Sequence, residues 1–266
     1  MDTKLLSKKF AQMGARVQFR PAITNLWRSE PAGIDIRADQ KGEYFDIRLV
    51  NTDQVDYKVV DVRPDMRHLL LMARRDRGKQ KFLCGHDERH WFVCAVPGDS
   101  VSNVVNAMEA LQPREVKTVV NRHVKRVKDR LRRRNKAFVR QGEWFFLRVE
   151  AMTVDPKLVL HNEPLSRGGG SKSHMCQNLY RRGGQMVWVC RQFPHGLTDE
   201  AYRATLHAFR KAKNWGWQRM LREPSVFVRG RVWHPDHKTI VLDEWHRVLM
   251  NTEREAPGVH HVVFLD

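Results

Sequence analysis

Apolar and polar side chains alternate along most of the first hundred residues. The segments ARVQFR, GIDIRA, EYFDIRLV, VDYKVVDVR and HLLLMAR follow this period of two and are separated by Gly, Pro, Asn and Asp. Such alternation is typical of half-exposed strands joined by turns. The pattern therefore predicts a strand-rich N-terminal portion with mixed or antiparallel pairing, preceded by a short amphipathic helix over 3–13.

Helical periodicity follows at 113–136. Pro113 suits the first position of a helix. Apolar side chains then recur within an arc of about 140°: Val116, Val119, Val120, Val124, Val127 and Leu131. The spacing predicts one long helix over 113–136, roughly 35 Å in length. Because Arg134 falls in line with the apolar stripe, the last turn is expected to project from the body of the protein.

The second half of the chain mixes strand-like and helical segments. A Gly- and Ser-rich stretch at 166–174 predicts a flexible loop and a domain boundary. Thr198 is expected to cap the helix that follows it. We therefore expect an α+β fold with a strand-rich portion at 1–165 that carries the basic helix 113–136, and a smaller α+β portion at 175–266. The two portions pack either separately or as one domain.

Positive charge changes the picture of the predicted helix. The chain has 48 Lys and Arg against 30 Asp and Glu, a formal charge of +18 and a pI near 10.2. Residues 113–140 alone hold twelve Lys or Arg against Glu115 and Asp129. Such crowding destabilises a helix through like-charge repulsion and raises affinity for polyanions. A basic pI of this size is typical of nucleic-acid-binding proteins.

The sequence thus predicts a protein that binds RNA or DNA mainly through phosphates, as part of a nucleoprotein assembly such as a ribonucleoprotein. The expected phosphate-binding residues are Lys117, Arg122, Lys125, Arg126, Lys128, Arg130, Arg132, Arg133, Arg134, Lys136 and Arg140. Trp215 and Trp217 lie among basic residues and are candidates for stacking on unpaired bases, which favours RNA or single strands. No known reading module is legible, so sequence-specific recognition is not predicted. The alternatives are an ordinary exposed helix and an adaptor that holds an acidic protein surface.

A second interpretation concerns catalysis. The segment WHPDHKTIVLDEWHRV at 233–248 places His234, Asp236, His237 and His246 close in sequence. Histidines and carboxylates are what a metal-dependent nuclease needs to hold a divalent metal and to activate water. The spacing matches no metal motif, and a turn at Pro235 and Asp236 explains the same residues without catalysis. The leading interpretation therefore assigns no cofactor and no catalytic residue.

The stretch CGHDERHWFVC at 84–94 suggests zinc, but its geometry argues against it. On a strand, His90 and Cys94 would lie roughly 13 Å apart and could not share an ion. Cys84, His86 and His90 remain a weak alternative site around a hairpin turn. The favoured interpretation is a hairpin with a charged tip, in which Cys84 and Cys94 are small core residues.

Cysteine usage and hydropathy concern the cellular compartment. The four cysteines are scattered and no apolar run is long enough for a signal peptide or a membrane span. We expect reduced thiols, a cytoplasmic location and no membrane association.

Overall fold

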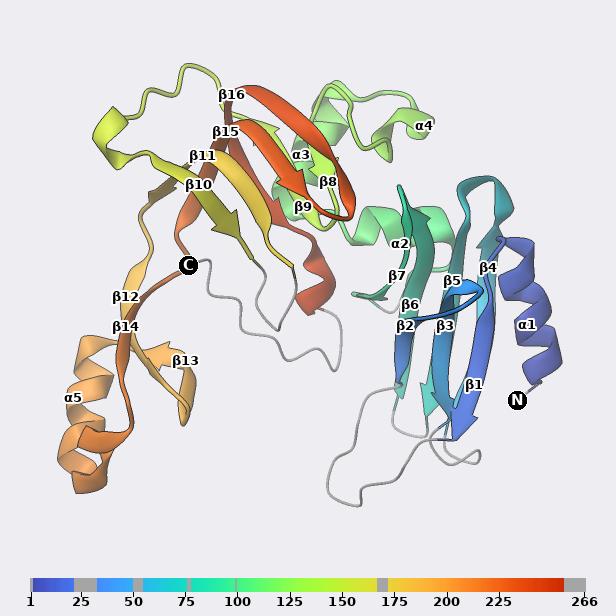
Figure 1. Ribbon diagram of the computed structural model, residues 1–266, viewed down its shortest axis with the longest axis horizontal. Helices are drawn as coiled ribbons and strands as arrows, with labels where there is room; N and C mark the ends of the chain where they lie inside the picture. Colours follow the sequence, from blue (N-terminus) through green and yellow to red (C-terminus); the bar gives the residue numbers. More distant parts are fainter. Residues whose placement is uncertain are drawn as a thin grey trace. The chain divides into compact units, whose positions relative to one another are not determined.

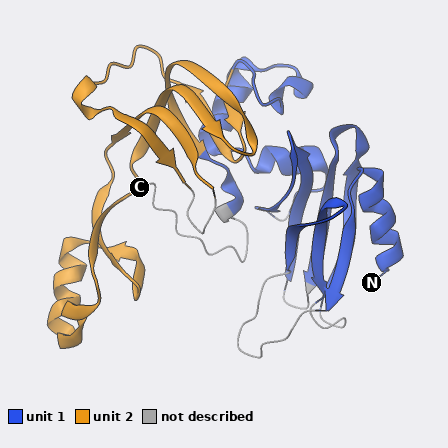
Figure 2. Cartoon of the chain, in the orientation of Figure 1, with its two compact units in different colours: residues 1–136, 250–259 blue, residues 137–249, 260–266 orange. Residues whose placement is uncertain are grey.

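The computed structural model describes residues 2–21, 33–49, 55–75, 78–98, 100–166 and 172–255 of the chain. The chain forms two compact units, which are coloured separately in Figure 2. Unit 1 comprises residues 1–136 and 250–259, and unit 2 comprises residues 137–249 and 260–266.

Unit 1 contains two sheets and four of the α-helices (Figure 1). The helices are α1 (Thr3–Gln12), α2 (Val104–Ala110), α3 (Arg114–His123) and α4 (Val127–Arg130). One sheet has the order β1-β3-β2, formed by β1 (Val17–Pro21), β2 (Ile34–Asp39) and β3 (Gly42–Leu49), and its β1–β3 pair is parallel. The other is an antiparallel meander of β4 (Asp56–Arg63), β5 (His68–Arg75), β6 (Gly78–Asp87) and β7 (His90–Val96). The pairing in unit 1 is thus mixed in one sheet and antiparallel in the other.

Strand β5 is buried on both faces because each face has its own cover. Leu69 and Leu71 pack with α1 and β3 in one core cluster. Leu70, which points the other way, packs with α2 in a second cluster. Successive side chains of a strand alternate between faces, so the run HLLLMAR serves two cores at once.

The single long helix expected at 113–136 is wrong. Helix α3 ends at His123, and Val124 has an extended backbone with φ −117° and ψ 97°. Helix α4 is one short turn, and its Arg130 reaches back to donate to Val124 O at 3.2 Å and to Asn121 Oδ1 at 3.1 Å. These bonds satisfy acceptors at the end of α3, and the break relieves the stacking of like charges that a continuous helix would impose.

The predicted α+β class, which included that long helix, is therefore also wrong. The described residues are predominantly strand, in four sheets, and their five α-helices are four to ten residues long. None of these helices has the length and apolar character needed to cross a bilayer.

Unit 2 is built on a six-stranded sheet with the order β10-β11-β15-β16-β9-β8. Its strands are β8 (Val139–Gln141), β9 (Trp144–Arg148), β10 (Leu160–Leu165), β11 (His174–Arg182), β15 (Ser225–His234) and β16 (His237–Met250). Trp144, Phe146 and Leu179 are fully buried in it. Of the loop expected at 166–174, residues 167–171 lie outside the described residues. The strands on either side of it, β10 and β11, pair with each other.

A smaller part of unit 2, residues 185–222, is called here the α5 module. It comprises β12 (Gln185–Cys190), β13 (Phe193–Leu197), α5 (Asp199–Ala208), the 3-10 helix η3 (Arg210–Asn214) and β14 (Gln218–Arg222). The strands form the sheet β13-β12-β14, and the ring of Tyr202 on α5 stacks on Trp188 of β12 at 4.3 Å. Thr198 caps α5 through its side chain, as expected.

The broken helix makes a prediction about two valines of one segment. Val120 on α3 is 3% exposed, whereas Val127 on α4 is 61% exposed. We expect Val120→Ala to lower the free energy of unfolding by about 2 kcal/mol, since it removes two buried carbons and leaves a cavity. Val127→Ala should change it by less than about 0.5 kcal/mol. Urea titrations test this. Equal losses would indicate the continuous helix, in which both valines share the packed stripe.

Candidate functional site

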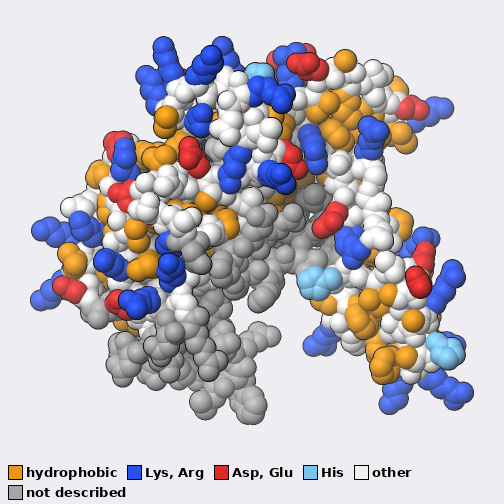
Figure 3. Space-filling view, turned by 180° about the vertical axis from the view of Figure 1, so that it is seen from behind, with side chains coloured by type: hydrophobic (Ala, Val, Ile, Leu, Met, Phe, Trp, Pro, Cys, Tyr) orange, Lys and Arg blue, Asp and Glu red, His pale blue; other side chains and the backbone are white. Residues whose placement is uncertain are grey.

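The residues predicted to bind phosphate lie on α3, on α4 and in the chain that follows to β8. Arg122, Lys125, Arg126, Lys128, Arg132, Arg134 and Lys136 are exposed. Lys117, Arg130, Arg133 and Arg140 are half-buried. Figure 3 shows Lys and Arg side chains crowding the surface over α3 and α4, at the upper left of that view.

Some of these cations are neutralised by the protein itself. Arg133 forms ion pairs with Asp87 and Glu88 at the tip of the β6–β7 hairpin. Arg132 pairs with Asp129 at 3.2 Å. The two pairs of Arg133 hold the chain after α4 against the hairpin of the same unit.

Five exposed cations are left without such a partner. They are Arg122, Lys125, Arg126, Lys128 and Lys136, and none is paired with a carboxylate of the described chain. We call these five residues the unpaired basic patch. All lie within residues 122–136, where Asp129 is the single acidic residue.

The α5 module contains the two tryptophans predicted to stack on bases. Trp215 and Trp217 are only half-exposed, because they pack with one another and with Phe193. Trp217 is fixed further by its Nε1, which donates to Ala212 O at 2.8 Å. Both rings therefore help to form the aromatic core of the module.

The α5 module also contains a more accessible ring, that of Phe209, which was not predicted from the sequence. Phe209 is 57% exposed at the end of α5, next to Arg210 and Lys211. Residues 185–222 hold seven Lys or Arg against two acidic residues, so this ring lies in a second basic region. Its position directly after the helical period of DEAYRATLHA is the signal that could have identified it.

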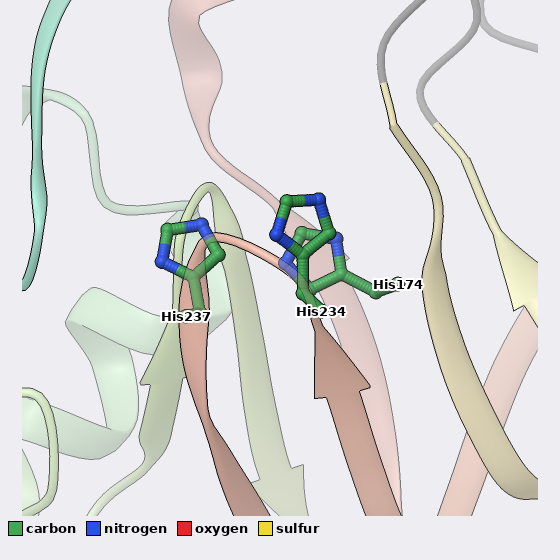
Figure 4. Close-up of side chains that lie close together, drawn as sticks. All are labelled: His174, His234 and His237. Atoms are coloured by element: carbon green, nitrogen blue, oxygen red, sulfur yellow. The ribbon is translucent and has the colours of Figure 1, made fainter.

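A third feature brings together histidines from two distant segments (Figure 4). His234 ends β15 and His237 begins β16, and they face each other across the two-residue turn of Pro235 and Asp236. The turn proposed for these two residues is thus confirmed. His174, the first residue of β11, joins them because β11 pairs with β15.

The three imidazoles lie close enough to share one ligand. The rings of His174 and His234 are 4.2 Å apart, and those of His234 and His237 are 4.9 Å apart, between centroids. One nitrogen from each ring can be chosen so that all three lie within 4.8 Å of one another. Within the described ranges of the chain, no other three His, Cys, Asp or Glu side chains meet in this way.

His174 is buried with its polar atoms unsatisfied. The side chain is 1% exposed, and neither ring nitrogen has a hydrogen-bond partner among the described residues. Burial, assisted by the neighbouring His234 and His237, lowers the pKa of His174 to about 3. The ring is therefore neutral near pH 7 and retains a lone pair on one nitrogen.

Further polar atoms surround the cluster. Gln141 of β8 is buried and donates from Nε2 to Lys238 O at 2.7 Å, but its Oε1 has no partner in the described chain. Gly142 has φ +58°, and a Cβ there would lie 2.9 Å from His237 Nε2 and 3.4 Å from His174 Nε2. The missing side chain leaves space beside both nitrogens.

His246 does not take part in this cluster, although the sequence suggested that it approaches His234 or His237. It pairs with Val228 in the β15–β16 ladder, nine residues along β16 from His237. Since a strand rises about 3.3 Å per residue, the two lie roughly 30 Å apart along it. Asp236 belongs to the turn itself, where it accepts from Lys172 at 2.8 Å.

The segment 84–94 forms the predicted hairpin with a charged tip, and Cys84 and Cys94 are core residues. Cys84 is fully buried, and its burial raises the pKa of the thiol. His86 packs edge-on against Trp91, and His90 Nδ1 lies 2.7 Å from Glu43 Oε1. The structure does not bring Cys84, His86 and His90 together as ligands.

We compared the chain with known protein families, curated proteins and solved structures. No family model, curated protein or solved structure matches the chain.

Burial of the cysteines makes a prediction about their reactivity. All four thiols are free and buried, and burial raises the pKa of Cys176 to about 12. Since the thiolate is the reactive species, raising the pH from 7 to about 9.5 should not expose a reactive thiol in the folded protein. Labelling with a thiol reagent before and after denaturation tests this. Rapid modification of Cys84 in the folded protein would contradict its place in the core.

Proposed function

We propose that this protein binds nucleic acid through the phosphates. The observation that carries the proposal is the unpaired basic patch of Arg122, Lys125, Arg126, Lys128 and Lys136. Five exposed cations so close in sequence repel one another, and no carboxylate of the described residues pairs with them. A phosphate backbone provides regularly spaced negative charge and gains entropy by releasing its counterions.

The form of this surface bears on what it binds. Helix α3 has ten residues and α4 has four, and the patch spans the bend between them. A bent surface of this kind suits a flexible chain of phosphates better than the straight groove of a duplex. Together with the exposed ring of Phe209 in the basic α5 module, it favours RNA or single strands.

Two further expectations accompany the proposal. A phosphate-binding protein without a reading module fits a component of a nucleoprotein assembly, where other proteins supply specificity. The four free cysteines fit a reducing compartment, so we place the protein in the cytoplasm. An adaptor for an acidic protein surface would use the same cations, and nuclease treatment of its complexes distinguishes it, because such complexes would survive.

Charge reversal tests the patch with a matched control. We expect Lys125→Glu with Lys128→Glu to lower affinity for a single-stranded RNA at least about tenfold. The slope of log affinity against log salt should flatten by about 1.4, because two phosphate contacts are lost. The control is Lys4→Glu with Lys8→Glu on α1, where both lysines are exposed and the change in net charge is the same. Fluorescence anisotropy at several salt concentrations gives both values, and equal losses in the two variants would reduce the patch to a nonspecific charge effect.

Base stacking on Phe209 makes a separate prediction. Phe209→Ala should weaken binding of single-stranded RNA by at least about fivefold and leave duplex binding unchanged, since one stacked base contributes about 1–3 kcal/mol. Leu158→Ala removes a similarly exposed apolar side chain, 55% exposed, and serves as the control. Unchanged affinity of Phe209→Ala for single strands would show that Phe209 does not stack on bases.

A further inference from the structure

The histidine cluster of unit 2 contains buried polar atoms that the protein leaves unsatisfied. Both ring nitrogens of His174, Oε1 of Gln141 and Nε1 of Trp144 are buried without a hydrogen-bond partner in the described chain. Each such atom costs about 1–3 kcal/mol when nothing binds it. Trp144 and His174 make an edge-on ring contact, with centroids 6.4 Å apart, so these atoms lie at one end of the six-stranded sheet. A bound species at this end would offset that cost.

The chemistry of the cluster selects a metal cation over an anion. An anion would be held by protonated imidazoles, but a charged ring at a position 1% exposed carries a large desolvation cost. Neutral imidazoles instead present lone pairs. Three of them within 4.8 Å form a donor set for a cation.

Nitrogen donors also restrict which cation fits. Calcium and magnesium take oxygen ligands, whereas imidazole suits zinc and its transition-metal neighbours. Zinc with three histidines and one open position is the pattern of a reactive zinc site, as opposed to a closed structural one. Ligand nitrogens about 2.0–2.1 Å from zinc lie about 3.3 Å apart, so the rings need to close by about 1.5 Å at most. His234 and His237, which would make this movement, are half-exposed and lie at a hairpin turn.

Gly142 accounts for the open side of the cluster. A Cβ at this position would come within 2.9 Å of His237 Nε2 and 3.4 Å of His174 Nε2. Glycine therefore keeps the space beside these two nitrogens free for an ion and its fourth ligand. Its φ of +58° is one that other residues adopt at a cost.

We propose that His174, His234 and His237 form a zinc-binding site with a fourth position open to water. His174 and His237 are the principal ligands through Nε2. His234 is a weaker ligand than His174, because its Nδ1 already accepts a hydrogen bond from the Asp236 amide at 3.1 Å, whereas neither ring nitrogen of His174 has a partner among the described residues. The site is independent of the proposed nucleic-acid binding, since it requires none of the cations of the basic patch.

Zinc binding to the full chain, after bound metal has been removed with a chelator, tests the proposal directly. Equilibrium dialysis should show one zinc per chain for the wild type. His174→Ala and His237→Ala should each weaken binding at least about 100-fold, and His234→Ala should weaken it less. His246→Ala, on the same strand as His237 but away from the cluster, should bind as the wild type does. Loss of zinc in His246→Ala, or retention in His237→Ala, overturns the assignment.

A measurement on the unchanged protein removes the dependence on variants that fail to fold. His174 is buried, so circular dichroism is needed to decide whether His174→Ala is folded. If it is not, the test by mutation relies on His237→Ala, since His237 is half-exposed. X-ray absorption of the zinc-loaded wild type should show three imidazole ligands and one oxygen ligand that is not part of an imidazole. Sulfur ligands, a single imidazole, or no zinc retained after dialysis would each contradict the proposal. Nucleic-acid affinity measured on the same zinc-free protein tests the proposed function separately.

Discussion

Electrostatic repulsion among an excess of cations is the constraint that links the broken helix to the proposed phosphate binding. Several ion pairs join separate elements. The buried Asp46 accepts from both Arg20 and Arg37, and Arg133 pairs with Asp87 and Glu88. A buried carboxylate is stable only when such partners surround it. The chain has 30 acidic residues for 48 basic ones, and residues 122–136 alone hold nine Lys or Arg against the single Asp129. The break in the helix there and the proposed phosphate binding are two consequences of one imbalance.

The histidine cluster differs from the basic patch because its buried ring is neutral. Burial keeps His174 neutral, so three basic rings can lie in contact without adding to the repulsion. The basic patch attracts anions through charge, whereas the cluster would bind a cation through lone pairs. The two features need different partners and lie in different units, so one chain can carry both without competition.

Local patterns predicted what depends on neighbours in sequence. The hairpin at 84–94, the Thr198 cap and the turn at Pro235 and Asp236 each follow from side chains within a few residues. The helix at 113–136 was wrong because a stripe of apolar positions records neither the repulsion among its cations nor the hydrogen bonds of Arg130 to the end of α3. His174 was missed because strand pairing brings it to residues about sixty positions away. The available hint was that His174 lies two residues before Cys176, on the same face of a strand.

Bound nucleic acid is detected by the absorbance ratio at 260 and 280 nm of the freshly purified protein, measured at low ionic strength before and after nuclease treatment. We expect a ratio raised by bound polynucleotide that falls to the value of protein alone once the nuclease has acted. A protein that elutes from the cell extract free of polynucleotide, with the same ratio before and after treatment, would contradict it.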